Sequence, residues 1–142
     1  KKNVKQGVEM LEAYSTKGNA FADYSLGTLY LNGSHLEKDV GRGLGYYERA
    51  KSANLGGAYA ALGLVYISGK DVPKDIDKAQ GILIEGAAAG HVNVQMLLAH
   101  YYQAGLFKVA NPKAEAIYWL CKAGYRGPQA YLNMYGEKLV CN

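Results

Sequence analysis

One short segment of the sequence recurs three times at a constant spacing, and this repetition constrains the fold more than any other feature. The segment that begins at Ala22, A-D-Y-S-L-G-T-L-Y-L-N-G, is matched 36 residues later from Ala58 and another 36 residues later from Val94. Repetition at a period of about 20 to 50 residues is typical of proteins built from stacked copies of one supersecondary unit. The sequence therefore predicts a solenoid, in which each unit contacts mainly its neighbours.

The spacing of the apolar residues predicts two helices in each unit. Leu26, Leu29 and Tyr30 lie at positions i, i+3 and i+4, which places them on one face of a helix. A glycine ends this first helix, and an Asp or Asn stands in each unit where the N-cap of a second helix belongs. The expected helix pairs are 20–32 with 40–53, 56–68 with 75–89, and 92–104 with 112–126; the expected ends are Gly33, Gly69 and Gly105, and the expected caps are Asp39, Asp75 and Asn111.

Glycine is abundant, with 18 among 142 residues, and its positions follow the repeat. Small residues share two phases of the unit: Gly27, Gly63 and Ala99 on the first helix, and Ala50, Gly86 and Ala123 on the second. Because small residues let backbones approach closely, we interpret them as packing positions. Asn54 stands in the phase of Gly90 and Gly127, which predicts a left-handed helix ending there. Three glycines within 41–45 each cost about 1 kcal/mol of helix propensity, so we expect helix 40–53 to be the least stable.

The repeat resembles a known family. The second unit reads A-x-x-x-L-G-x-x-Y-x-x-G from Ala58 to Gly69, continues through the loop V-P-K-D to Asp75, and ends at Gly90 after a K-A pair and further alanines. This pattern is similar to the Sel-one-like repeat (SLR) family, an offshoot of the tetratricopeptide-like solenoids. The ordinary tetratricopeptide repeat is the main alternative, but its period is about 34 residues.

The resemblance implies the fold class and the division of the chain. It implies an all-α, right-handed α-α superhelix of about three complete 36-residue helix pairs with a half repeat at each end. The whole chain, 1–142, is then one solenoid, with repeats at about 19–54, 55–90 and 91–127 and half repeats at 4–18 and 128–140.

Composition excludes several classes of partner. Sixteen Lys and Arg against twelve Asp and Glu give a net charge of +4, an excess too weak to indicate nucleic acid binding. Two stretches without formal charge, 52–69 and 86–107, contain several Asn, Gln, His and Gly residues that are costly in lipid, so we expect no membrane span. No apolar run follows the first four residues, so no secretion signal is visible in this chain.

The two cysteines are too few for a disulfide scaffold or a structural zinc site. If Cys121 and Cys141 lay on antiparallel helices joined near Gly127, their Cα atoms would be roughly 12 Å apart along the axis. A disulfide needs about 7 Å or less. We therefore expect a free, buried Cys121, and a bridge only if the tail after Leu139 folds back.

The sequence shows no catalytic, metal or cofactor motif. The glycines of 41–45 follow no predicted strand and lack a phosphate-loop continuation. His35, His91 and His100 lie at different phases of the repeat, and the acidic residues around Asp75 belong to a helix cap and a solvated loop. We therefore expect no enzymatic activity, no bound metal and no cofactor.

By analogy with tetratricopeptide relatives, the first helix of each unit lines the concave face, where a solenoid binds its partner. In the first unit this selects either Asp23 or Tyr24. The candidate partner-binding residues are Phe21, Tyr24, Thr28, Ala60, Leu64, Met96, His100, Gln103, Asn133 and Glu137. They mix aromatic, aliphatic and Met side chains with little charge, which is typical of interface hot spots. The alternative is that they only pack between repeats.

The thirteen tyrosines allow a further reading. Tyr30, Tyr66 and Tyr102 recur at a core phase. Tyr47, Tyr59, Tyr101, Tyr118 and Tyr125 are off that phase, so we expect them to be partly exposed, where they could instead form a platform for a glycan.

The favoured function is a non-catalytic module that binds a helix or loop of another protein in its concave groove. The resemblance implies a bacterial envelope or secreted adaptor, a regulator or an effector-immunity protein, in the periplasm or outside the cell, and the residues do not choose among these. One alternative is a cell-wall or β-lactam-binding protein with weak hydrolase activity. Another is a scaffold of a eukaryotic-type secretory pathway.

Overall fold

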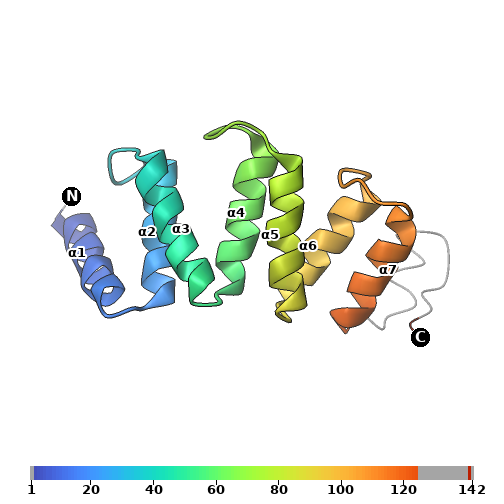
Figure 1. The fold of residues 1–142 in the computed structure, drawn as a ribbon. Coiled ribbons are helices and arrows are strands. Elements are labelled where there is room, and N and C mark those ends of the chain that lie inside the picture. The colour runs from blue at the N-terminus through green and yellow to red at the C-terminus, as the bar shows by residue number, and fades with distance from the viewer. Residues whose placement is uncertain (1, 125–140, 142) are drawn as a thin grey trace.

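The computed structural model describes residues 2–124 and residue 141. Residues 2–124 form α-helices joined by short loops, without a strand (Figure 1). The helices are α1 (Lys2–Thr16), α2 (Ala20–Asn32), α3 (Val40–Ser52), α4 (Gly56–Ser68), α5 (Ile76–Ala88), α6 (Val92–Gln103) and α7 (Pro112–Lys122). The predicted helix pairs are confirmed, with bounds that differ by four residues or fewer.

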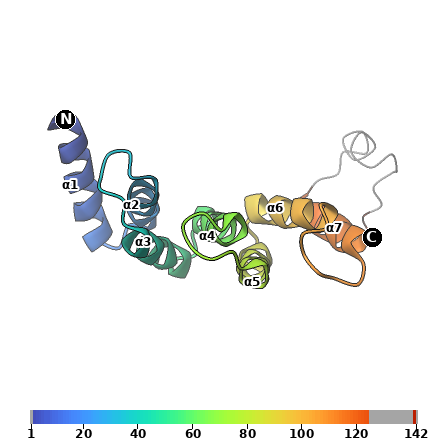
Figure 2. The same ribbon diagram turned by 90° about the horizontal axis from the view of Figure 1, so that it is seen from above.

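The helices stack as consecutive pairs in a row. α2 packs on α3, α4 on α5 and α6 on α7, while α1 packs on α2, α3 on α4 and α5 on α6. Seen from above, α2 and α4 lie along one side of the row and α3 and α5 along the other (Figure 2). The row is gently curved, with α2, α4 and α6 on its inner side (Figure 2). The predicted all-α solenoid is therefore confirmed.

The capping residues fix where the second helix of each pair begins. The side chains of Asp39, Asp75 and Asn111 accept hydrogen bonds from backbone N–H groups three residues later, at 2.9, 2.9 and 3.1 Å. Each bond satisfies one of the N–H groups that a helix leaves unpaired at its N-terminus. The three predicted caps are confirmed.

Left-handed residues end the helices. Gly33 and Gly69, with φ of 65° and 64°, close α2 and α4 as predicted. Asn54 takes the same region after α3, with φ 59°. Only the predicted end of α7 was wrong: the helix ends at Lys122 instead of 126, because Gly124 already adopts φ 77°. Gly127 lies outside the described residues.

The core follows the repeated leucines. Leu26, Leu62 and Leu98 are fully buried, one in each unit. Tyr47 and Tyr59, which the sequence analysis expected to be partly exposed, are buried as well. A Cβ atom on Gly27 would lie 2.6 Å from the Tyr47 ring, and one on Gly86 would lie 2.7 Å from the ring of Tyr59. The prediction failed because each ring fills the space above a glycine of the paired helix.

The N-terminal half unit forms α1, which a buried polar cluster joins to the first complete unit. The Ser15 hydroxyl donates to Asp23 at 2.6 Å, and the Arg49 guanidinium lies 3.3 Å from the same carboxylate. Arg49 also donates to the Ser15 carbonyl at 3.1 Å. Asp23 therefore lies buried in the contact of α1, α2 and α3. The expected half unit 128–140 lies outside the described residues, as does Tyr125.

The two cysteines form a disulfide, which corrects the expectation of a free Cys121. The Cα atoms of Cys121 and Cys141 lie 5.6 Å apart, within the range that a disulfide requires. The expected Cα–Cα separation of roughly 12 Å assumed that Cys141 lies on a helix antiparallel to α7. Cys141 lies outside any helix and is exposed, so a helical rise does not describe its position.

No helix within residues 2–124 is long and apolar enough to cross a bilayer. In the same part of the chain, no three His, Cys, Asp or Glu side chains gather in a way that could hold a metal ion.

Candidate partner-binding surface

A groove of about 400 Å³ lies between α2 and α4. Both helices are on the inner side of the curved row (Figure 2). We call this hollow the α2–α4 groove. Its lining residues are Tyr24, Leu31 and Asn32 of α2, Tyr47 of α3, Gly57, Ala60, Ala61, Leu64 and Val65 of α4, Asp71 of the following loop, and Asn93 of α6. Most of these side chains are apolar or aromatic, so the groove suits an apolar segment.

The groove exists because α4 carries small residues at three phases where α2 and α6 carry mostly larger ones. Gly57, Ala60 and Ala61 of α4 stand in the phases that Phe21, Tyr24 and Ser25 occupy on α2, and Asn93, Met96 and Leu97 on α6. The Tyr24 ring reaches toward α4, where a Cβ on Gly57 would lie 3.4 Å from it. Large side chains on both sides and small ones between them leave a hollow along α4.

Two tyrosines form the α2 side and floor of the groove. The ring centroids of Tyr24 and Tyr47 lie 5.5 Å apart. The Tyr47 hydroxyl lies 2.9 Å from the Thr28 hydroxyl, which also lies 3.0 Å from the Tyr24 carbonyl oxygen. Burial raises the pKa of Tyr47 above its ordinary value, although the hydrogen bond with Thr28 acts in the opposite direction. The Tyr47 hydroxyl therefore stays protonated at physiological pH, and its hydrogen bond with Thr28 orients it.

The rim of the groove is polar but almost uncharged. Asp71 is the one formally charged side chain in the lining. It forms an ion pair with Lys38, which lies in the loop between α2 and α3. The side chains of Asn32 and Asn93 are exposed and make no hydrogen bond within the described part of the chain. A carboxamide can donate and accept, so both are free to bind a partner's backbone.

The structure brings three of the predicted residues together in this groove: Tyr24, Ala60 and Leu64. Thr28 lies behind the floor, where it contacts Tyr47. The other described candidates are exposed outside the groove: Phe21 in the first turn of α2, and Met96, His100 and Gln103 on α6. Asn133 and Glu137 lie outside the described residues.

Sequence reasoning missed most of the α4 wall and both asparagines. Gly57 and Ala61 carry no chemical signal of their own. The signal that could have found them is the difference between units, since only the second unit has small residues at both phases. Tyr47 was missed because it is off the core phase shared by Tyr30, Tyr66 and Tyr102.

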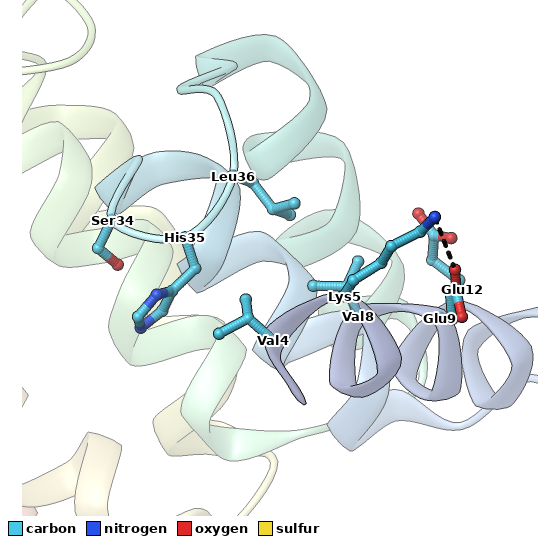
Figure 3. A pocket seen from close by; sticks show the side chains of 8 residues that line it. All are labelled: Val4, Lys5, Val8, Glu9, Glu12, Ser34, His35 and Leu36. Carbon is cyan, nitrogen blue, oxygen red and sulfur yellow. Dashed lines mark ion pairs between the residues drawn. The ribbon is translucent and has the colours of Figure 1, made fainter. Parts of the chain in front are cut away.

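A second and larger pocket, of about 630 Å³, lies between α1 and the loop that follows α2. Its lining residues are Val4, Lys5, Val8, Glu9, Glu12, Ser34, His35 and Leu36. Val4 and Leu36 face each other across it, and Lys5 forms an ion pair with Glu9 along α1 (Figure 3). None of the predicted binding residues lines this pocket.

Three segments of the chain match the family model described as Sel1 repeat: residues 20–55, 57–91 and 92–128. Together they cover most of the sequence. Comparison with curated proteins finds none that matches significantly.

Two solved structures are similar in fold. The Sel1 repeat protein from Oxalobacter formigenes is 27% identical with a TM-score of 0.73, and the match covers 92% of this chain and 98% of that one. The second is c5321, described as a protective antigen of uropathogenic Escherichia coli strains that displays an SLR fold. It is 29% identical with a TM-score of 0.73, and the match covers 89% of this chain but only 29% of that one.

Proposed function

The chain belongs to the Sel1 repeat family, whose members generally mediate protein–protein interactions, and on this premise we propose that it binds a partner protein in the α2–α4 groove. The observation that carries the proposal is the groove itself, an apolar hollow on the concave face bounded by Tyr24 and Leu64. Leu64 is a large apolar side chain that is 43% exposed, so a partner that covers it would remove apolar surface from water.

The chemistry of the groove indicates what kind of segment it binds. An apolar side chain of the partner would replace water between the Tyr24 ring and Leu64, which is favourable by about 25 cal/mol for each Å² of apolar surface buried. The carboxamides of Asn32 and Asn93 would hydrogen-bond the polar groups beside it. Because the rim carries almost no net charge, we expect the affinity to depend only weakly on salt.

For the biological role, we favour a bacterial adaptor, regulator or effector-immunity protein of the envelope or the secreted fraction. The disulfide between Cys121 and Cys141 supports this compartment, because disulfides persist mainly in oxidising environments. Both similar structures named above are of bacterial proteins, which agrees with this role.

Affinity capture with the intact chain, followed by calorimetric titration of the purified partner, tests the proposal. Leu64→Asp places a charge in the groove, and Ala60→Leu fills it without a change of charge; each should weaken binding by at least about tenfold, or about 1.4 kcal/mol. The matched control is Ile84→Asp on α5. Ile84 is 38% exposed, so the same change of chemistry is made outside the groove.

Three further outcomes separate the alternatives. Met96→Asp should weaken binding only if the partner extends over α6. Lys74→Asp, in the loop between α4 and α5, is a second control outside the groove. If Ile84→Asp or Lys74→Asp abolished binding while both groove variants bound normally, the partner would bind another face and the proposed site would be wrong. Turnover of a labelled β-lactam or of peptidoglycan fragments by the pure chain would instead favour the enzymatic alternative.

A further inference from the structure

The joint between the second and third units shows what the α2–α4 groove lacks. α4 and α6 pack against each other, whereas among the described helices no comparable contact joins α2 to α4. Three positions of the groove lining carry larger side chains in the third unit. They are Ala61, Val65 and Asp71, and the residues 36 positions later are Leu97, Tyr101 and Phe107.

The larger side chains fill the joint between α4 and α6. Phe107 is fully buried, and Leu97 and Tyr101 pack against the same core cluster. That cluster also contains Leu62 and Leu83 of the second unit. The ring centroids of Tyr101 and Phe107 lie 5.5 Å apart. The chain therefore closes this joint with aromatic side chains of its own, while the corresponding place beside α2 stays open.

An aromatic ring that enters the open place finds aromatic neighbours. The rings of Tyr24 and Tyr47 line the groove, and they already pair with each other at 5.5 Å. Aromatic rings at such distances attract each other beyond the gain from buried area alone. Ala61 and Val65 leave the space on α4 that the Leu97 and Tyr101 side chains take up on α6.

The loop end of the groove is polar, which favours a ring that carries a hydroxyl group. Asn32 is the last residue of α2 and Asp71 lies in the loop after α4, and the two helices end at the same edge of the row (Figure 1). Asp71 binds Lys38, but a carboxylate can accept further hydrogen bonds. A phenol can donate to Asp71 or to the Asn32 carboxamide. A purely apolar side chain would cover these oxygens without replacing their hydrogen bonds to water.

Building on the proposed function, we propose that the α2–α4 groove recognises a tyrosine side chain of the partner. The ring packs against Tyr24 and Tyr47 above the small residues of α4, and the hydroxyl points to the end lined by Asn32 and Asp71. The chain's own Tyr101, in the phase of Val65, is the template for this arrangement.

NMR titration of the intact, ¹⁵N-labelled chain with N-acetyl-tyrosinamide tests the recognition. The titration extends to about 20 mM, because a single side chain binds in the millimolar range. We expect saturable shifts at the backbone amides of Ala60, Ala61 and Leu64. N-acetyl-phenylalaninamide should bind more weakly, and N-acetyl-leucinamide at least about fivefold more weakly. The absence of saturable shifts with the tyrosine amide, or equally tight binding of either other amide, would overturn the proposal.

Filling the groove from within tests the location. Val65→Tyr copies Tyr101 and should weaken binding of N-acetyl-tyrosinamide at least about tenfold. The matched control is Ile84→Tyr on α5, which introduces the same side chain outside the groove and should bind like the unaltered chain. Ala61→Leu, which copies Leu97, is a second filling variant with the same expected direction. Circular dichroism checks that the helices are retained. Unchanged binding by a helical Val65→Tyr or Ala61→Leu chain would contradict the assigned place.

This inference and the proposed function fail in different ways. Suppose that Leu64→Asp and Ala60→Leu weaken partner binding but the three amides bind equally. The proposed function then stands and the preference for tyrosine is wrong. If the tyrosine amide binds selectively while both groove variants leave partner binding unchanged, the groove recognises tyrosine but the captured partner binds elsewhere.

Discussion

Gly27 and Gly43 face each other across the α2–α3 contact, and a Cβ atom built on either residue would lie 3.0 Å from the carbonyl oxygen of the other. A neighbouring backbone cannot move aside as the end of a flexible side chain can. These two glycines therefore set the distance between the helices of the first unit. Gly41 and Gly45, the other glycines of α3, have no backbone of another helix this close. They lower the helix propensity of α3 without a packing role, whereas Gly43 allows the close contact with α2.

Replacing glycines on α3 should have opposite effects at neighbouring phases. Gly43→Ala should destabilise the chain by about 1–3 kcal/mol, because the new methyl group meets Leu31 and the backbone of Gly27. Gly45→Ala should stabilise it by about 0.5–1 kcal/mol, because the site is open and alanine favours helix. Urea denaturation of both variants measures this difference, and equal effects would show that packing does not distinguish the two sites.

The features predicted best were those fixed by local chemistry or by the repeat itself. Asp39 caps α3 through a bond to a residue three positions away, and Leu62 shares its phase with Leu26 and Leu98. The burial of Tyr47 was not foreseen, because it depends on Gly27, which is 20 residues distant and on another helix.

The groove and the disulfide were harder to foresee for two further reasons. A repeat pattern describes what the units share, whereas the α2–α4 groove arises where the second unit differs from the others, at Gly57 and Ala60. The disulfide depends on where the chain returns after α7, and Cys141 lies outside the repeat pattern. The seven predicted helices that the structure describes needed no such information.

Truncating a central leucine should reveal the phase of the core. Leu62→Ala should cost about 2–5 kcal/mol, because Leu62 is fully buried and its removal leaves a cavity between packed helices. Leu98→Ala should cost a similar amount in the next unit. Thermal or urea denaturation measures the loss. Leu64→Ala, two residues away and 43% exposed, is the control, and it should cost clearly less.

Removing the buried carboxylate should loosen α1. Asp23→Ala deprives the Ser15 hydroxyl and the Arg49 guanidinium of their shared acceptor, and we expect a loss of about 1–3 kcal/mol. Amide hydrogen exchange in α1 should quicken more than exchange in α5. Glu9→Ala removes an exposed ion pair from the same helix and should change stability by less than about 0.5 kcal/mol. Similar losses in the two variants would contradict a special role for the cluster.

The disulfide should be visible by mass and by stability. The intact mass should be about two hydrogens below that of the reduced chain. Because the bridge closes a loop across a separation of 20 residues, reduction or Cys141→Ser should lower the free energy of unfolding by about 2–4 kcal/mol. Free thiols in protein purified without reductant would contradict the pairing of Cys121 with Cys141.

Alkaline pH should destabilise the chain through its buried tyrosines. Burial raises the pKa values of Tyr47, Tyr101 and Tyr102 in the folded state. In the unfolded chain a tyrosine releases its proton near pH 10. Just above that pH the unfolded state therefore binds fewer protons than the folded state, so the free energy of unfolding falls as pH rises. The stability that these groups contribute is fully present below about pH 10 and is lost as pH rises through their folded pKa values.

Urea denaturation at about pH 8, 10 and 11, which spans the ordinary tyrosine pKa, measures this dependence. Tyr47→Phe removes one of the three groups, so its stability should fall less steeply above pH 10 than that of the unaltered chain. Leu64→Ala changes the same groove without removing a titratable group, and it should keep the original slope. The difference in slope between these two variants isolates Tyr47, because the lysines that also titrate at high pH are common to both. A Tyr47→Phe slope as steep as that of Leu64→Ala would mean that the Tyr47 hydroxyl is not desolvated by the groove floor.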